Sequence, residues 1–506
     1  MSAHSQVVVR AGLVVTMDGE RRMIRDGAVA VADGRITAVG PASEVLRDVG
    51  ADAGRGRDVP GDEQAGPRGP GPDSGSGGTQ AGAAPPGTAS GSGPGRRRLE
   101  VHHVPDGVIM PGMVDAHQHL TGDRLVRSSI PDDISSNEAI FSWAVPVHET
   151  HNADDDELSA TLAAVEAACN GVTAIVEAGT VAHPERVAAG VGAVGLRATI
   201  GTWGWDADGV PFAGSTDEVL ARQAAVLDRF PPGGLVTGWV TLVGHDLMSD
   251  ELLVGASELA RQQGTGLTFH ISPHDRDAEA WLARSGRRPL VHFDELGALG
   301  PHVLLAHAVH LDNAEVDVVL NRRVAVASCP WAYLRLAQGM ATAARHWELA
   351  ERGGRLALGC DSENAGDQID VLRAAALFAG LGKDARRDPS APGAHTALEL
   401  ATVRGAEAVG LGDVTGALAP GLSADLVVLD GTRPEWTPPG ADPALQLVWG
   451  TDGRAVQDVM VAGRWVVRGR QPTGVDLAAL RTAARDAQAA LVARSGIRPR
   501  PRWPLT

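Results

Sequence analysis

Two separate parts of the chain alternate apolar and polar residues, the pattern of half-buried β-strands. Residues 6–46 contain VVVRAGLVVTMDG and GAVAVADGRITAVG, in which Asp-Gly steps favour tight hairpins. After about residue 411, strand-like pieces return as ADLVVLDG, DVMVAG and RWVVRG. Because the first segment cannot close a core alone, we expect residues 1–50 and 411–472 to form one discontinuous β domain. A polar, Arg-rich and Ala-rich helix is expected at 475–495, packed outside this domain.

Between these parts, residues 107–410 show a different pattern, in which short β-type runs alternate with helical segments. This is the pattern of repeated βα units around a parallel sheet. Eight candidate strands are found, and this number predicts an α/β fold with a closed (β/α)8 TIM barrel. The expected strands lie at 108–117, 172–178, 196–201, 235–243, 267–271, 302–307, 324–328 and 356–361.

A third kind of segment, residues 51–98, separates the first β pieces from the barrel. It is rich in Gly, Pro and Ser and almost devoid of large apolar side chains. Such a composition cannot bury enough surface to offset the entropy of ordering the chain. We therefore predict a disordered insertion.

Charge and cysteine content narrow the class of protein. The formal net charge of the 506 residues is -17, and the only short basic run is Arg96–Arg98, which argues against a nucleic-acid groove. No apolar run approaches the roughly 18 residues of a membrane span, and the start lacks the pattern of an export signal. The chain has three cysteines, Cys169, Cys329 and Cys360, without CxxC spacing. An odd number without that spacing argues against a disulfide framework. We expect a cytoplasmic protein with a small-molecule partner.

Polar residues stand at the ends of several expected barrel strands. His117 and His119 end the first strand, His270 the fifth, His307 the sixth and Asp361 the eighth. Functional side chains of a parallel barrel gather at the C-terminal strand ends, so these residues should meet at one mouth. Imidazoles and a carboxylate suit Zn²⁺ or Fe²⁺ with a water completing the coordination shell. The pattern predicts a metal site for hydrolysis.

The motif PGMVDAHQHL, at 111–120, resembles the first-strand HxH motif of the amidohydrolase superfamily. The similarity continues through HIS at 270–272, LLAHAVHL at 304–311 and LGCDSENAGD at 358–367. GRITAVGP and GALAPGLSADLVVLD resemble the composite β-sandwich that accompanies this barrel. The most similar branch contains the methylthioadenosine/S-adenosylhomocysteine deaminases, guanine deaminases and triazine hydrolases.

This resemblance implies roles for individual residues and an oligomer, either a homodimer or a homotetramer. His307 would hydrogen-bond the attacked group or the water, and His245 would contact substrate. The metal ligands would be His117, His119, His270 and Asp361. Binuclear members bridge two metals with a carboxylated lysine from strand four, but the only lysine here is Lys383, far downstream. A mononuclear site is therefore expected.

The chain departs from the branch on strand five. Deaminases of this branch usually read HxxE there, and the glutamate moves a proton to the ring, whereas here Pro273 stands in the glutamate position. A proline side chain cannot transfer a proton. His274, Asp275 and Glu363 are the candidate substitutes, with His274 first because it titrates near neutrality. Glu363 is also a candidate for contacting substrate.

The strand-seven loop differs as well, because SCPWAYLRLAQG has Trp331 and Tyr333 where related enzymes carry small polar residues. We expect Trp331 to contribute to an aromatic substrate pocket, with Trp203 and Trp205 either adding to that pocket or packing in the core.

These observations lead to one preferred hypothesis and two alternatives. The preferred function is a mononuclear metal-dependent hydrolase that cleaves a non-peptide C–N bond in a cyclic or heteroaromatic small molecule, with Asp361, His307 and His274 as catalytic residues. Zn²⁺ is the expected metal, with Fe²⁺ as the alternative. A deaminase that releases ammonia from an amino-substituted purine, pterin or triazine is the second function, and a non-catalytic scaffold on the same fold is the third.

Overall fold

The computed structural model describes residues 5–54, 98–499 and 501–503. Of the expected insertion at 51–98, residues 55–97 therefore lie outside the described residues. Residues 51–54 end helix α1 (Ala42–Gly54), and residue 98 begins strand β4 (Arg98–Pro111). Among the described residues, no helix is both long and apolar enough to cross a membrane.

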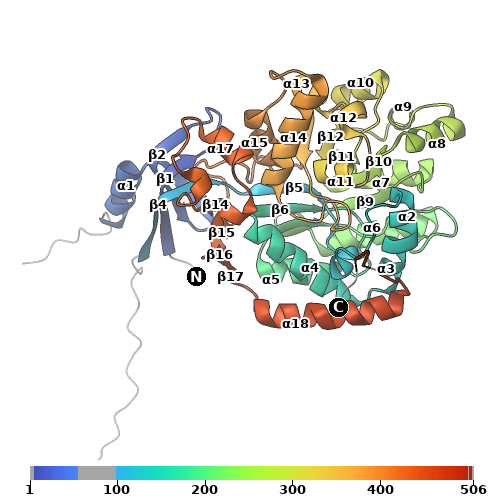
Figure 1. Cartoon of the computed structure of the whole chain (residues 1–506), viewed down its shortest axis with the longest axis horizontal. Helices are drawn as coiled ribbons and strands as arrows, with labels where there is room; N and C mark the ends of the chain where they lie inside the picture. The colour runs from blue at the N-terminus through green and yellow to red at the C-terminus, as the bar shows by residue number, and fades with distance from the viewer. Residues whose placement is uncertain (1–4, 55–97, 500, 504–506) are drawn as a thin grey trace, which may run out of the picture.

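The central part of the chain is a barrel of parallel strands surrounded by helices (Figure 1). Four strands form one sheet and five form another, and every strand pair within them is parallel. The barrel closes between β13 and β5, where the backbone N–H of Asp361 donates to the carbonyl of His117 at 2.8 Å. The strands are β5 (Met113–Gln118), β6 (Val172–Glu177), β7 (Arg197–Ile200), β8 (Val236–Gly238), β9 (Val240–Gly244), β10 (Leu267–Ile271), β11 (Val303–His307), β12 (Ala325–Ser328) and β13 (Arg355–Leu358).

The expected strands match this barrel, with two differences in detail. The fourth expected strand is divided by Trp239 into β8 and β9. The first expected strand is divided at Gly112, because its first residues belong to β4. A Cβ atom at Gly112 would lie 2.1 Å from the Thr173 hydroxyl oxygen, so only glycine fits where the chain passes from one sheet into the other.

Long helices cover the outside of the barrel, and short helices lie at its mouth. Long helices follow the strands, and their starts are capped in the usual way, as where Asn152 accepts hydrogen bonds from the amides of Asp154 and Asp155. The helices are η1 (Asp123–Val126), α2 (Ser136–Glu138), the π-helix η2 (Ala139–Ala144), α3 (Val145–Thr150), α4 (Ala153–Cys169), α5 (Pro184–Val194), α6 (Thr216–Arg229), α7 (Asp250–Gln263), α8 (Asp275–Ser285), α9 (Pro289–Glu295), α10 (Asn313–Asn321), α11 (Pro330–Arg335), α12 (Met340–Ala343), α13 (His346–Glu351), α14 (Val371–Arg386), α15 (Ala394–Ala401) and α16 (Val403–Ala408).

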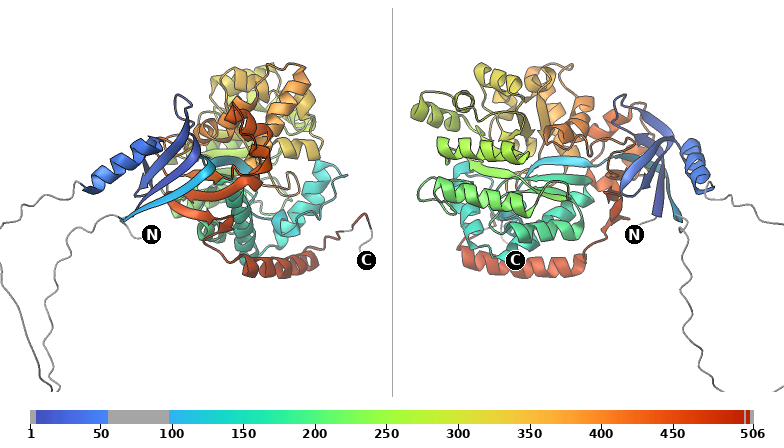
Figure 2. Two further views of the ribbon diagram at one scale, coloured as in Figure 1. Left: turned by 60° about the vertical axis from the view of Figure 1, so that its left-hand side comes forward. Right: turned by 180° about the vertical axis from the view of Figure 1, so that it is seen from behind.

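The two ends of the chain combine in a third sheet, of eight strands, beside the barrel (Figure 2). Its strand order is β17-β16-β15-β14-β4-β1-β2-β3, so β4 joins the N-terminal hairpins to the C-terminal strands through a parallel pair with β1 and an antiparallel pair with β14. The predicted TIM barrel with a small composite β domain is confirmed. The remaining elements are β1 (Ser5–Val15), β2 (Met23–Ala32), β3 (Arg35–Pro41), β14 (Leu426–Leu429), η3 (Pro434–Trp436), α17 (Pro443–Trp449), η4 (Gly453–Ala455), β15 (Val456–Val461), β16 (Arg464–Arg468), β17 (Gln471–Pro472) and α18 (Leu477–Ser495).

Candidate active site

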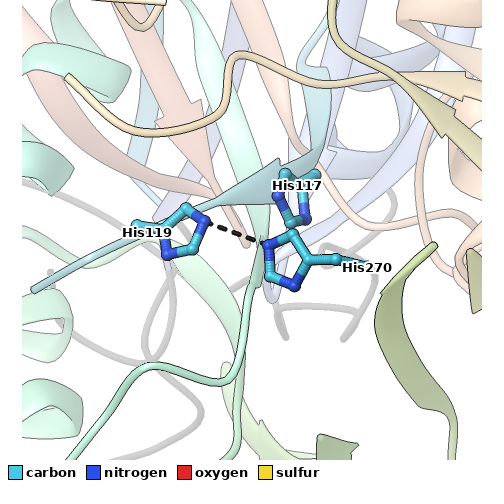
Figure 3. A group of neighbouring side chains, drawn as sticks. All are labelled: His117, His119 and His270. Atoms are coloured by element: carbon cyan, nitrogen blue, oxygen red, sulfur yellow. Dashed lines mark hydrogen bonds between the residues drawn. The ribbon is translucent and has the colours of Figure 1, made fainter. Parts of the chain in front are cut away.

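Three histidines from two barrel strands converge at the C-terminal mouth of the barrel (Figure 3). His117 lies on β5, His119 follows the end of that strand, and His270 lies on β10. The Nε2 atoms of His119 and His270 are 3.3 Å apart, and the His117 ring centroid is 4.7 Å from that of His270. Each of the three offers one nitrogen, and these nitrogens all lie within 4.8 Å of one another, as a shared metal ion requires.

Asp361 and His307 complete this cluster from neighbouring strands, because His307 ends β11, which pairs with β10, and Asp361 follows β13, which lies beside β5. The Oδ1 atom of Asp361 is 3.4 Å from Nε2 of His119 and 3.7 Å from Nε2 of His117. His307 Nε2 lies 4.0 Å from Asp361 Oδ2. The five residues that the sequence pattern places at strand ends are therefore brought together in space.

Ring nitrogens of the cluster are left without hydrogen-bond partners, and this observation fits a metal ion. Both ring nitrogens of His117 are buried without a hydrogen-bond partner. His270 Nδ1 donates to the Val243 carbonyl at 2.7 Å, and His119 Nδ1 lies 2.9 Å from the Thr180 hydroxyl, so the Nε2 atom of each ring faces the cluster. Outer partners of this kind orient metal-binding imidazoles. The donor set therefore suits a divalent metal.

The ionisation states in the cluster agree with this interpretation. Burial, together with the neighbouring histidines, holds the pKa values of His117 and His270 well below the ordinary value for histidine. Burial raises the pKa of Asp361, but the hydrogen bond with His119 and the charges of His117 and His307 outweigh it and hold that pKa below its usual range. Neutral imidazoles and an ionised carboxylate are the forms that bind metals, and the pKa directions of His117, His270 and Asp361 match them. For His119, burial lowers the pKa, but the hydrogen bond and charge of Asp361 outweigh the effect of burial and raise this pKa instead.

Backbone strain marks the same strand ends. His307 has φ of 73° and Asp361 has φ of 65°, and His245 and Ser272 also have positive φ values, 54° and 47°. For residues other than glycine such values cost of order 1–3 kcal/mol each and persist mainly at functional sites. Of these four residues, His245, His307 and Asp361 line the cavity at the barrel mouth, whereas the Ser272 hydroxyl is buried without a hydrogen-bond partner.

A cavity opens above the cluster, and its wall is largely aromatic and aliphatic. The segment between β5 and α4 contributes Ile130, Ile140, Phe141 and Val145. Trp203 and Trp205, both buried, line the cavity after β7, so they form part of the pocket as well as the core. Of the residues expected to act on substrate, the cavity is lined by His245, His274, His307 and Asp361.

Two residues expected to contact substrate lie elsewhere. Trp331 stacks on the Arg373 guanidinium, whose carbon is 4.4 Å from the ring centroid, and it is outside the set of described lining residues. Glu363 is fully buried and pairs with Arg124 at 2.9 Å, also outside that set. Burial raises the pKa of Glu363 to about 8 despite this pair. Both side chains therefore contact arginines of neighbouring elements outside the cavity lining.

Pro273, at the position where the resemblance implies a glutamate, is buried and lines the cavity, and Asp275 is exposed on the first turn of α8. The lining residues that the sequence analysis did not name include His148, Asp277, Gln338 and Asn364. Asp277 had a sequence signal, because it lies three residues after His274 and so on the same face of a helix. His148 lies on the short helix α3, and Gln338 and Asn364 lie on loops, so their positions are defined only by the fold.

Fold and site together define a metal-dependent hydrolase with a TIM barrel. The chain belongs to the amidohydrolase family, because the model of the "Amidohydrolase family" matches residues 108–466. A model described as "Imidazolonepropionase-like composite domain, bacteria" matches residues 27–48, in the small sheet. The protein is therefore an enzyme that hydrolyses carbon–nitrogen bonds, and a divalent metal belongs to its site.

Individual relatives support this assignment. The chain is 28% identical over 470 residues to a 5-methylthioadenosine/S-adenosylhomocysteine deaminase of Syntrophobacter fumaroxidans, covering 93% of this chain and 94% of the relative. It is 31% identical to a 5'-deoxyadenosine deaminase of Methanopyrus kandleri, covering 71% and 81%. An adenosine deaminase structure from Xanthomonas campestris with bound zinc superposes with a TM-score of 0.82 at 25% identity, covering 97% and 99%. Escherichia coli guanine deaminase shares the fold, with a TM-score of 0.72, 18% identity and coverage of 92% and 99%.

Proposed function

We propose that the protein is a mononuclear zinc aminohydrolase that releases ammonia from an amino-substituted heteroaromatic ring, with purine nucleosides as the first substrate class. The observation that carries this proposal is the cluster of three histidines and one aspartate at the base of an aromatic cavity. The relatives named above support the substrate class, since their names refer to adenosine derivatives.

The proposed ligands of the single metal are His117, His119, His270 and Asp361. A second metal has no bridging lysine, since the chain's only lysine, Lys383, lies on α14 and donates to a backbone carbonyl there, that of Ala391 at 3.3 Å. When bound, a divalent metal acidifies water and polarises the attacked group. Zinc is preferred because the Xanthomonas structure contains it, with Fe²⁺ as the alternative.

The remaining chemistry belongs to the side chains. Asp361 takes a proton from the attacking water and passes it to the departing nitrogen, which its position between the histidines and the cavity allows. His307, at 4.0 Å from Asp361, hydrogen-bonds the oxygen that develops charge. His274 takes over the proton transfer to the ring, because it lines the cavity beside Pro273 and its Nε2 is buried without a partner.

Ring-opening hydrolysis of a cyclic amide is the second candidate, and Pro273 favours it. That reaction needs one group to accept the water proton and return it to the leaving nitrogen, so Asp361 alone suffices. Ammonia separates the two functions, because deamination releases it whereas ring opening adds one water and releases nothing.

The test is ammonia release and product mass with zinc-loaded enzyme on adenosine derivatives, guanine, pterins, triazines and cyclic amides. Asp361→Asn should lower kcat by about 10²–10⁴-fold, as expected for loss of a proton-transfer group. Asp384→Asn, at an exposed position on α14, is the matched control and should keep wild-type kcat. Full activity and unchanged metal content in Asp361→Asn would contradict the proposed mechanism.

We also propose that the enzyme works in the cytoplasm as a homodimer or homotetramer, without a nucleic-acid or membrane partner. The net charge of -17 supports the absence of a nucleic-acid partner, because it disfavours binding to phosphate backbones. Light scattering of the purified protein measures the oligomeric state, and a monomer at micromolar concentration would contradict that part of the proposal.

A further inference from the structure

Asp277 is a carboxylate on the cavity wall, and one of its two oxygens has no hydrogen-bond partner. It lies in the first turn of α8, beside His274, and it lines the cavity. Its Oδ2 atom is buried without a hydrogen bond. A buried carboxylate oxygen without a donor is costly, so its persistence in a cavity wall points to a ligand that supplies the donor.

A second acceptor faces the same cavity from another loop. Gln338 is only 5% exposed, and its Oε1 atom has no hydrogen-bond partner. The loop is held in place by His310, whose Nε2 lies 2.9 Å from the Gln338 carbonyl oxygen. Two unpartnered acceptors from separate elements therefore line one cavity, and a ligand that carries N–H or O–H donors would satisfy both.

The charged residues of the cavity wall also favour a ligand that carries hydrogen-bond donors. Asp123, Asp277 and Asp361 line the cavity, whereas none of the described lining residues is arginine or lysine. Arginines of the surrounding elements have other partners: Arg284 pairs with Asp246 at 2.7 Å, and Arg124 pairs with Glu363. Neither of these arginines pairs with Asp277, and the side-chain charges that lower its pKa are those of His274 and His310.

The surroundings of Asp277 favour a donor or a cation over a further anion. Burial raises the pKa of Asp277, the charge and backbone amide of His274 lower it, and the charge of Asp246 raises it further. An acidic group on the substrate would add repulsion in a poorly solvated wall, whereas an ammonium or hydroxyl group would relieve it.

We infer that Asp277 selects substrates by charge: the substrate carries a hydrogen-bond donor or a cationic group, and no acidic group, on the side that lies against the first turn of α8. This inference rests on the proposed function, and it narrows the substrate class to neutral or cationic amino-heterocycles. An S-adenosylhomocysteine-like tail, which bears a carboxylate, is disfavoured, whereas neutral and amine-bearing adenosine derivatives fit.

The test compares three ligands that share the adenosine ring system and differ only at the 5' position: 5'-deoxyadenosine, 5'-amino-5'-deoxyadenosine and adenosine-5'-carboxylate. Zinc-loaded full-length enzyme should show kcat/KM for the amine and the neutral compound at least about tenfold above that for the carboxylate. Asp277→Asn should remove most of the preference for the amine over the carboxylate. Asp275→Asn, two residues away and exposed, should keep the wild-type order.

Binding is measured alongside turnover, because Trp203 and Trp205 line the cavity and report occupancy by fluorescence. The expected order of Kd is amine tightest and carboxylate weakest in the wild type, with the spread reduced in Asp277→Asn. If this order holds without any ammonia release, the proposed deamination fails and the charge selection stands. Carboxylate binding as tight as the amine, no binding of the amine, or an unchanged order in Asp277→Asn overturns the inference.

Discussion

At the scale of single residues, His346 supports the active site without lining its cavity. It lies at the start of α13, and its Nε2 donates to the carbonyl of His307 at 2.7 Å, while its Nδ1 is 3.0 Å from the Ser328 hydroxyl. His307 has a positive φ, and this hydrogen bond holds its carbonyl in the strained position. Burial lowers the pKa of His346 to about 4.

The lowered pKa makes stability depend on pH in a definite direction. Because the unfolded chain binds the proton near pH 6.5 and the folded chain only near pH 4, acidification favours the unfolded state. The stability is fully present above pH 6.5 and is lost as the pH falls through 4, by up to about 3 kcal/mol for this residue. Denaturant unfolding of wild type and His346→Gln across this window measures the difference.

His346→Gln keeps a donor for the His307 carbonyl but cannot titrate, so the free energy of unfolding should fall less steeply with acidification than in the wild type. Other titrating groups are common to both proteins and cancel in the comparison. Parallel pH profiles for the two proteins would show that His346 does not bind its proton preferentially in the unfolded state.

At the scale of elements, the loop after β13 is held by a buried network of charges. Arg124, on η1, pairs with Glu363 at 2.9 Å and with Glu166 of α4 at 2.7 Å. Arg127 joins the same Glu166 to Asp367 at the far end of the loop. Asp361, a proposed metal ligand, lies in this loop, so the network fixes one wall of the active site to two helices.

Removing Arg124 should be destabilising, because the buried Glu363 carboxyl group, whose pKa is about 8, loses its hydrogen-bond donor and Glu166 loses one of its two arginine partners. Arg124→Ala is expected to lower the free energy of unfolding by about 1–3 kcal/mol. Adding Glu363→Gln removes the unpartnered carboxyl group and should recover part of that loss, which urea unfolding of the single and double variants measures.

Arg186→Ala is the matched control for a surface pair, since Arg186 and its partner Asp154 are both exposed to solvent. Its cost should stay within about 1 kcal/mol. A loss for Arg124→Ala no larger than this control, or no recovery in the double variant, would show that the network does not stabilise the loop.

At the scale of the whole molecule, the C-terminal helix returns to support the cavity from outside. α18 runs along the barrel near α4 and α3 (Figure 1), and Leu491 packs with Leu125, Val126 and Val147. These partners belong to η1 and α3, the segments between β5 and α4 that also form the apolar cavity wall. The last helix is thus part of the support of the substrate pocket.

Leu491→Ala should lower the free energy of unfolding by about 2–5 kcal/mol, because it removes a fully buried side chain between separate elements. Gln488→Ala, exposed on the same helix, should change it by less than about 0.5 kcal/mol. Calorimetry of both variants measures the difference, and similar melting temperatures would mean that α18 contributes little to the fold.

The barrel was predictable from local sequence patterns, and so was the convergence of the residues proposed as metal ligands. Fully buried parallel strands appear as short apolar runs, and functional side chains follow them at the C-terminal ends, so His117, His270 and Asp361 could be assigned to one mouth from the sequence. The amidohydrolase motifs then identified the family. The first ten residues of strand β4, RLEVHHVPDG, were missed, because they are rich in polar residues and end in Pro-Asp-Gly, a sequence typical of turns.

The sequence by itself thus determined the fold class, the family and the residues of the proposed metal centre. Only the tertiary structure decided which loop residues face the substrate. It turned Glu363 toward Arg124 and Trp331 toward Arg373, and it placed Asp277 and Gln338 in the cavity wall instead. The physical reason is that a strand end has a position defined by barrel geometry, whereas the direction of a loop side chain depends on partners that lie far away in the sequence.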